Sequence, residues 1–166
     1  MKRKRAKMLL LKSELRIGQN SPNSLNENKI VESIAHVHVL RLRPHEDLKM
    51  CLLLWAKKHQ VKAAVVISCV GSLEQFHLRY ANQSSGDRKK GFFEILSLTG
   101  TISDTYAHLH LSLADEQGIA KGGHLLDGNL IYTTAEIAIA ELTDMVFARE
   151  KDPVYGYDEL NVQKKP

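Results

Sequence analysis

Three of the chain's eight histidines lie within one short stretch, HLHLSLADEQGIAKGGH, which runs from His108 to His124. Its opening residues, HLHLSLAD, alternate between polar and apolar side chains, which predicts a β-strand with His108 and His110 on one face. Imidazole nitrogen is a common zinc ligand, and three histidines that meet in space leave the fourth tetrahedral position open to water or a ligand. Whether they meet depends on the turn that follows the strand.

The residues EQG after Asp115 predict a three-residue hairpin loop whose glycine adopts the left-handed conformation. If Asp115 pairs with Ile119, the same register places His110 directly opposite His124, with His108 as its diagonal neighbour. The spacing leaves two interpretations open: a three-histidine zinc site, or polar-face histidines that hydrogen-bond to their neighbours.

Other residues could also belong to a functional site, but the sequence around them gives less support for that role. Glu94, in FFEILSL, is a candidate acid/base or partner of the metal ligands, and the alternative is an exposed glutamate or an ion pair between subunits. Arg41 and Arg79 are candidates for that ion pair. A second His-x-His pair, His36 and His38, shares its strand face with apolar residues and has no glycine turn beside it, so we interpret it as packing or interface.

Hydrophobic periodicity predicts an α+β fold with a largely antiparallel mixed sheet and one main helix. Asp115 and Asp127 stand beside turn glycines and are interpreted as structural. A turn is expected at Gly71 and Ser72, and a bend at Gly100. The expected helix covers 46–59, an exposed loop covers 82–91, and strands are expected over 34–43, 62–70, 73–81, 92–103, 108–115, 125–142 and 145–150.

Composition and charge limit the classes of protein that the chain can belong to. The net charge is +4, and much of the excess lies in MKRKRAK at the start. Residues 1–30 are rich in Asn and Ser and are predicted to be a basic, disordered arm. Its KRKR run is a candidate nuclear-import signal or DNA-phosphate contact, with a solvated terminus as the alternative.

Cys51 and Cys69 form no C-x-x-C motif, and we interpret them as reduced thiols of an intracellular protein. No apolar run is long enough for a signal peptide or a membrane span. We therefore expect a cytoplasmic or nuclear protein with no membrane contact.

The run GFFEILSLTGTIS…HLHLSLADEQGIAKGGHLLDGNLIYTTAEIAIAEL and the ending VFAREKDPVYGYDEL resemble the plant and prokaryote conserved (PPC, or DUF296) domain. LRLRPHEDL and VVISCVGSL resemble further segments of that family. The resemblance predicts a domain over 34–162, between the arm at 1–30 and a tail at 163–166. It implies a homotrimer, and it implies that His108, His110 and His124 bind a metal ion, zinc.

Plant relatives join this domain to AT-hooks, which bind A·T-rich DNA, but the R-G-R-P core of an AT-hook does not occur here. The chain thus looks like the metal-keeping branch without the hook. We expect a trimeric metal-binding module with a DNA-binding or regulatory role and an unidentified small ligand at the metal. The alternative is a small zinc-dependent hydrolase or lyase that uses the three-histidine site.

Overall fold

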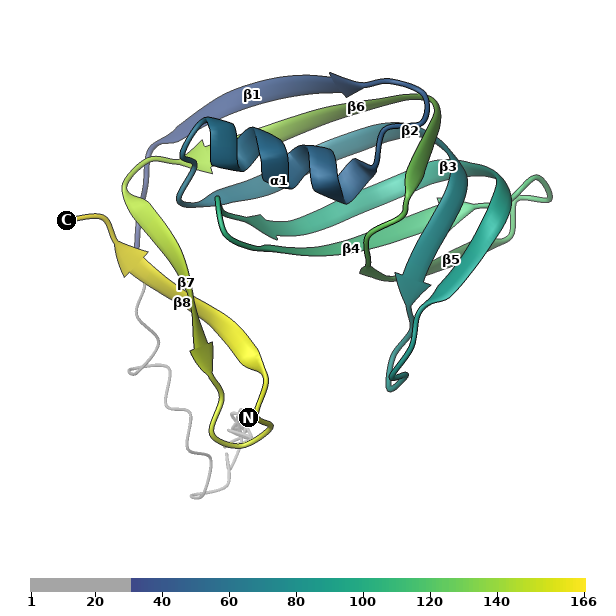
Figure 1. Cartoon of the computed structure of the whole chain (residues 1–166). Coiled ribbons are helices and arrows are strands. Elements are labelled where there is room, and N and C mark those ends of the chain that lie inside the picture. The colour runs from purple at the N-terminus through teal and green to yellow at the C-terminus, as the bar shows by residue number, and fades with distance from the viewer. Residues whose placement is uncertain (1–30) are drawn as a thin grey trace, which may run out of the picture. The chain divides into compact units, whose positions relative to one another are not determined.

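The computed structural model describes residues 31–166, so the predicted basic arm at 1–30 lies outside the described residues. Within the described range the chain forms eight strands and one helix (Figure 1). In chain order these are β1 (Ala35–Leu42), α1 (Leu48–Lys58), β2 (Ala64–Arg79), β3 (Asp87–Ile102), β4 (Ala107–Ala114), β5 (Ala120–Leu125), β6 (Leu130–Leu142), β7 (Met145–Lys151) and β8 (Asp158–Lys164).

Six strands form one sheet in the order β1-β6-β2-β3-β4-β5, and β7 and β8 form a separate hairpin. The end of β2 also pairs with β5, where Arg79 lies opposite His124, so β2, β3, β4 and β5 close into a ring. Every strand pair in residues 31–166 is antiparallel. The expected sheet and single helix are confirmed, but the sheet is not mixed, and one 11-residue helix fits the α+β class only loosely.

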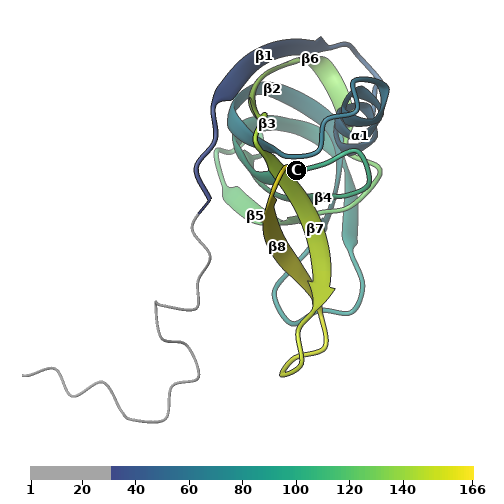
Figure 2. The ribbon, with the colours of Figure 1, turned by 90° about the vertical axis from the view of Figure 1, so that its left-hand side faces the viewer.

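The helix α1 lies across one face of the sheet, as Figures 1 and 2 show. Asp47 caps its first turn by accepting a 3.0 Å hydrogen bond from the Met50 amide. Side chains one turn apart are fully buried against the sheet: Leu48, Leu52 and Ala56. Each leucine buried in this way contributes roughly 1.5–3 kcal/mol. No helix in 31–166 has the length and apolar character needed to cross a membrane.

The expected turn at Gly71 and Ser72 is wrong, because β2 continues through both residues. Gly71 has a φ of +147° and bends the strand instead. A Cβ at this position would lie far inside van der Waals contact of the Thr134 carbonyl oxygen on β6. The glycine therefore marks a close approach of two backbones rather than the end of a strand.

The expected loop over 82–91 is shorter than predicted, because β3 begins at Asp87. Asp87 pairs with Leu78 in the ladder, and its carboxylate accepts a 3.0 Å hydrogen bond from the Tyr80 hydroxyl. These contacts hold a polar segment in extended form despite its loop-like composition. The strand β8 was also missed, because DELNVQK is polar and is paired only with β7.

The expected bend at Gly100 brings β3 unusually close to β4. Gly100 has a φ of +137°, and a Cβ there would collide with the carbonyl oxygen of His108. The residue that packs this close to a site histidine must therefore be glycine.

We expect Gly100→Ala to destabilise the protein by at least about 2 kcal/mol, because it combines an unfavourable φ with a backbone collision. Urea unfolding at constant pH measures the change. The matched control is Gly118→Ala, where φ is +75° but nothing lies within 4 Å of the added Cβ, so only about 1 kcal/mol of conformational strain is expected. Equal losses in the two variants would mean that the collision at Gly100 is not real.

Candidate metal centre

The hairpin of β4 and β5 has the register that the sequence predicted. The Asp115 amide donates a 3.2 Å hydrogen bond to the Ile119 carbonyl, and Gly118 has a φ of +75°. His110 is consequently the cross-strand partner of His124. The local chemistry of the turn thus fixes which histidines face each other.

Alternation along β4 directs the histidines to the outer face of the ring. Its leucines are buried, whereas His110 is exposed and His108 is half-buried. Burial of the leucines anchors the strand and determines which way the imidazoles point.

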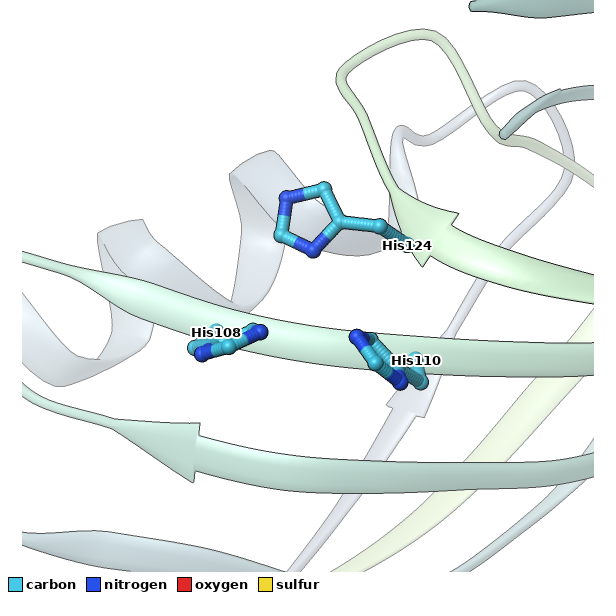
Figure 3. A group of neighbouring side chains, drawn as sticks. All are labelled: His108, His110 and His124. Atoms are coloured by element: carbon cyan, nitrogen blue, oxygen red, sulfur yellow. The ribbon is translucent and has the colours of Figure 1, made fainter. Parts of the chain in front are cut away.

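The three imidazoles face one another, with one nitrogen of His124 directed toward the other two rings (Figure 3). The ring centroid of His108 lies 5.2 Å from that of His110 and 5.2 Å from that of His124. Each histidine offers one nitrogen, and these three nitrogens lie within 4.8 Å of one another. The geometry brings together three nitrogen donors from two strands.

Burial and neighbouring positive groups favour the neutral form of two of these rings, His108 and His124. Desolvation, together with His108 and Arg79, lowers the pKa of His124 to about 4. Desolvation, followed by His110 and Arg149, also lowers the pKa of His108. Neutral imidazole is the form that binds metal, so these rings are ready to coordinate at neutral pH.

The donor set fits a zinc ion on two observations. Three nitrogens about 2.1 Å from one tetrahedral ion lie about 3.4 Å from each other, which small ring rotations within the observed 4.8 Å would reach. In addition, the Nδ1 atom of His124 is buried and has no hydrogen-bond partner among residues 31–166. A buried polar atom without a partner is costly, and a metal bond would satisfy it.

Two glycines before His124 allow β5 to lie between its neighbours. A Cβ at Gly123 would lie 2.8 Å from the carbonyl oxygen of Arg79, and a Cβ at Gly122 would lie 2.9 Å from the carbonyl oxygen of Leu111. Both approaches are too close for a side chain. The glycines therefore bring His124 within reach of β2 as well as β4.

Asn129 fixes the ends of β2 and β5 where Arg79 and His124 lie. This fully buried side chain accepts from the His77 amide at 2.9 Å and donates to the Leu126 carbonyl at 2.6 Å. Because all its polar atoms are paired, it joins the two strand ends without leaving an unsatisfied group.

Three cavities surround the histidines. One of about 470 Å³ is lined by His108 and His124, and a second of about 270 Å³ by His108 and His110. A third of about 420 Å³ is lined by His110 and His124. A metal held by the three rings would thus be open to small molecules from several sides.

Glu94 does not join the histidines within one chain. It is exposed and pairs with Ala114, four residues beyond His110 along β4, which is about 13 Å at strand spacing. Arg41 donates a 3.2 Å hydrogen bond to Thr134 instead of pairing with Glu94. An ion pair of Glu94 with an arginine of another subunit stays a prediction.

The rival pair, His36 and His38, lies on β1, which is the opposite edge of the sheet from β5. The His38 ring contacts Glu141 at 2.9 Å and packs against Trp55. His36 is exposed. The packing interpretation therefore agrees with the contacts of His38.

The two aspartates interpreted as structural make the contacts that such a role requires. Asp115 accepts hydrogen bonds from two amides of its own turn, those of Gln117 and Ile119. Asp127 instead forms a 3.0 Å ion pair with Lys49 of α1.

Sequence patterns missed three residues that line the cavities at the histidines: Tyr106, Arg149 and Glu159. Arg149 and Glu159 come from the β7–β8 hairpin, which lies outside the six-stranded sheet. No local spacing connects them to the histidines. The only signal was the family-like ending VFAREKDPVYGYDEL, in which both residues occur.

Comparison with known proteins gives a family match over most of the chain. Residues 30–143 match the model of the Plants and Prokaryotes Conserved (PCC) domain. The chain is 45% identical over 128 residues to a bifunctional protein GlmU of Synechococcus sp. strain JA-3-3Ab, covering 77% of this chain and 21% of that protein. The chain therefore spans only about a fifth of this curated relative.

Solved structures share the fold. A hypothetical protein from Salmonella matches with a TM-score of 0.81 at 37% identity, covering 82% of this chain and 99% of that one. A metal-containing protein from Archaeoglobus fulgidus matches with a TM-score of 0.69 at 24% identity, covering 81% and 99%. A proposed DNA-binding protein from Bacteroides thetaiotaomicron matches with a TM-score of 0.68 at 22% identity, covering 78% and 94%.

The neutral histidines predict a pH dependence of stability in the metal-free protein. The pKa of His124 is about 4 in the folded chain and about 6.5 in an unfolded one, so the unfolded state binds more protons between these values. The free energy of unfolding should therefore fall as pH is lowered from about 6.5 to about 4. Urea unfolding in the presence of a chelator measures it.

In the His124→Gln variant this pH slope should be smaller, because one of the groups responsible is gone. The control is His36→Gln, on the exposed surface of β1, which should keep the wild-type slope. A His124→Gln protein with an undiminished slope would contradict the account of its burial.

Proposed function

The chain belongs to the Plants and Prokaryotes Conserved domain family, and on that premise we propose that it is a trimeric metal-binding module whose zinc ligands are His108, His110 and His124. The observation that carries the proposal is the convergence of three imidazoles from β4 and β5, one of which, His124, has a buried nitrogen without a hydrogen-bond partner among residues 31–166. A structural neighbour that is itself a metal-containing protein is in keeping with this proposal.

Zinc suits this donor set better than the common cations that prefer oxygen ligands. Imidazole nitrogen favours Zn²⁺ over Ca²⁺ and Mg²⁺, which prefer oxygen ligands. With three protein ligands, one coordination position stays available to a small ligand. We propose that the module responds to such a ligand, with the protein holding and orienting it.

Replacing His108, His110 or His124 singly by Ala should remove most of the bound zinc, because two imidazoles hold the ion far more weakly than three. Elemental analysis of the purified, dialysed proteins measures the metal per chain. His36→Ala is the matched control, since it removes an exposed strand histidine far from the cluster and should leave the metal content unchanged. Full metal content in His124→Ala would contradict the proposed site.

The trimer is supported by an apolar face that one chain leaves uncovered. Val37 and Val39 on β1 are 62% and 78% exposed, and Val70 on β2 is 59% exposed. The strand registers place all three on the face opposite α1. A neighbouring group of apolar residues this exposed is typical of a subunit interface.

Light scattering should give about three times the 18.7 kDa chain mass. Val39→Asp should lower that mass toward one chain, because it would bury an unpaired carboxylate between subunits. Ile119→Asp is the control, since Ile119 is 62% exposed in the β4–β5 turn, at the other edge of the sheet from β1, and no other large exposed apolar residue lies in that turn. A wild-type monomer at micromolar concentration would contradict the proposed assembly.

A DNA-binding role is proposed only for the basic arm. Residues 31–166 contain 15 lysines and arginines against 17 aspartates and glutamates, so they lack the positive excess that DNA backbones attract. The proposed DNA-binding neighbour is 22% identical and shares the fold alone. The metal module is therefore the primary proposal and DNA contact a secondary one.

A catalytic role stays the alternative, and Glu159 is the observation in its favour. This carboxylate lines two of the cavities that the histidines line, whereas Glu94 lies away from them. A metal-bound water needs a nearby base to become an efficient nucleophile. We place ligand binding first because Glu159 forms no ion pair with an imidazole nitrogen of the three histidines.

A further inference from the structure

Two arginines lie beside the three histidines and form no ion pair with an acidic residue of the described range, 31–166. Arg79 is the cross-strand neighbour of His124 and lines two of the three cavities, and Arg149 lines the cavity shared by His108 and His110. The ion pairs formed within residues 31–166 involve neither arginine. Two guanidinium groups that lack an ion-pair partner, next to a metal-binding cluster, favour the binding of a negatively charged ligand.

Arg149 is held in place by groups that leave its charge unneutralised. Its guanidinium lies 4.2 Å from the centre of the Tyr106 ring and donates a 3.5 Å hydrogen bond to the Thr101 hydroxyl. Stacking on an aromatic face orients the planar fork and keeps its remaining donors free. A donor oriented in advance loses less entropy when it binds an anion.

We propose that Arg149 and Arg79 form an anion-recognition site, so that the ligand of the proposed zinc centre is a small molecule carrying a carboxylate or phosphate group. The inference rests on the proposed function, because the ion and the two arginines would hold the same molecule. A guanidinium pairs with two oxygens of such a group at once, which would fix the orientation of the ligand at the metal. The cavity of about 470 Å³ that Arg79 lines is within the size range of small-molecule sites, and the cavity that Arg149 lines shares His108 and Glu159 with it.

The charges of the cavity make this recognition depend on the metal. Asp158 and Glu159 line the cavity of Arg79, and Glu159 also lines the cavity of Arg149, so over these two cavities the two guanidinium groups balance the two carboxylates. A divalent ion on the histidines adds two positive charges and gives the site a positive balance. Small anions should therefore bind to the zinc-loaded protein and much more weakly to the metal-free protein.

Calorimetric titration with sodium phosphate and, separately, with sodium malonate tests the inference on wild type, Arg149→Gln and Arg43→Gln. The metal content of each protein is measured first. Arg149→Gln should keep its zinc and lose about tenfold or more in affinity, because one charge-assisted hydrogen-bonding group is removed. Arg43, exposed just after β1, is the matched control, and Arg43→Gln should bind as wild type does.

The anion that binds more tightly identifies the class of the ligand. Equal affinities in wild type and Arg149→Gln, or no binding of either anion to a zinc-loaded wild type at 10 mM, would overturn the inference and leave the proposed metal centre standing. Absence of zinc from the wild-type protein would appear already in the metal analysis and would overturn the proposed function itself.

Discussion

The structure of the site depends on one constraint, the close approach of backbones in the ring formed by β2, β3, β4 and β5. At Gly100 and Gly123 a side chain would collide with carbonyl oxygens of the neighbouring strands. With glycine at these positions β3 closes on β4, and β5 closes on β2. His108 and His124 belong to the strands that are drawn together in this way. The same glycines that close the ring therefore also bring the imidazoles close together.

Electrostatics and packing both favour the neutral form of His124, which is the form that binds a metal ion. Partial burial makes the charged form of His124 unfavourable, and the neighbouring His108 ring and Arg79 guanidinium add to the effect. A neutral ring with an unpartnered buried nitrogen is poorly satisfied by protein alone and well suited to a metal ion. The same arginines that keep the rings neutral are available to an anionic ligand once an ion has bound. The same arginines thus favour metal binding by the histidines and the binding of an anionic ligand at the metal.

The sequence predicted the part of the site that depends only on residues close together in the chain, which is the hairpin of β4 and β5. The Asp115 turn and the alternation of β4 together determine that His110 faces His124, because a hairpin register depends on only a few residues. It did not predict Arg149 and Glu159, which reach the histidines from a hairpin outside the sheet. Composition also misled at Gly71, which interrupts a strand pattern in the sequence but bends a continuous strand in the fold. Contacts between distant segments leave no periodic signal.

The central claim is that the three imidazoles bind one ion and leave one position open. X-ray absorption at the zinc edge of the loaded protein reports the type and number of atoms around the metal directly. The account predicts three nitrogens at about 2.0–2.1 Å whose outer-shell scattering identifies imidazole, together with one oxygen, and no sulfur. A spectrum with sulfur at about 2.3 Å, or with oxygen ligands and fewer than three imidazoles, would contradict it.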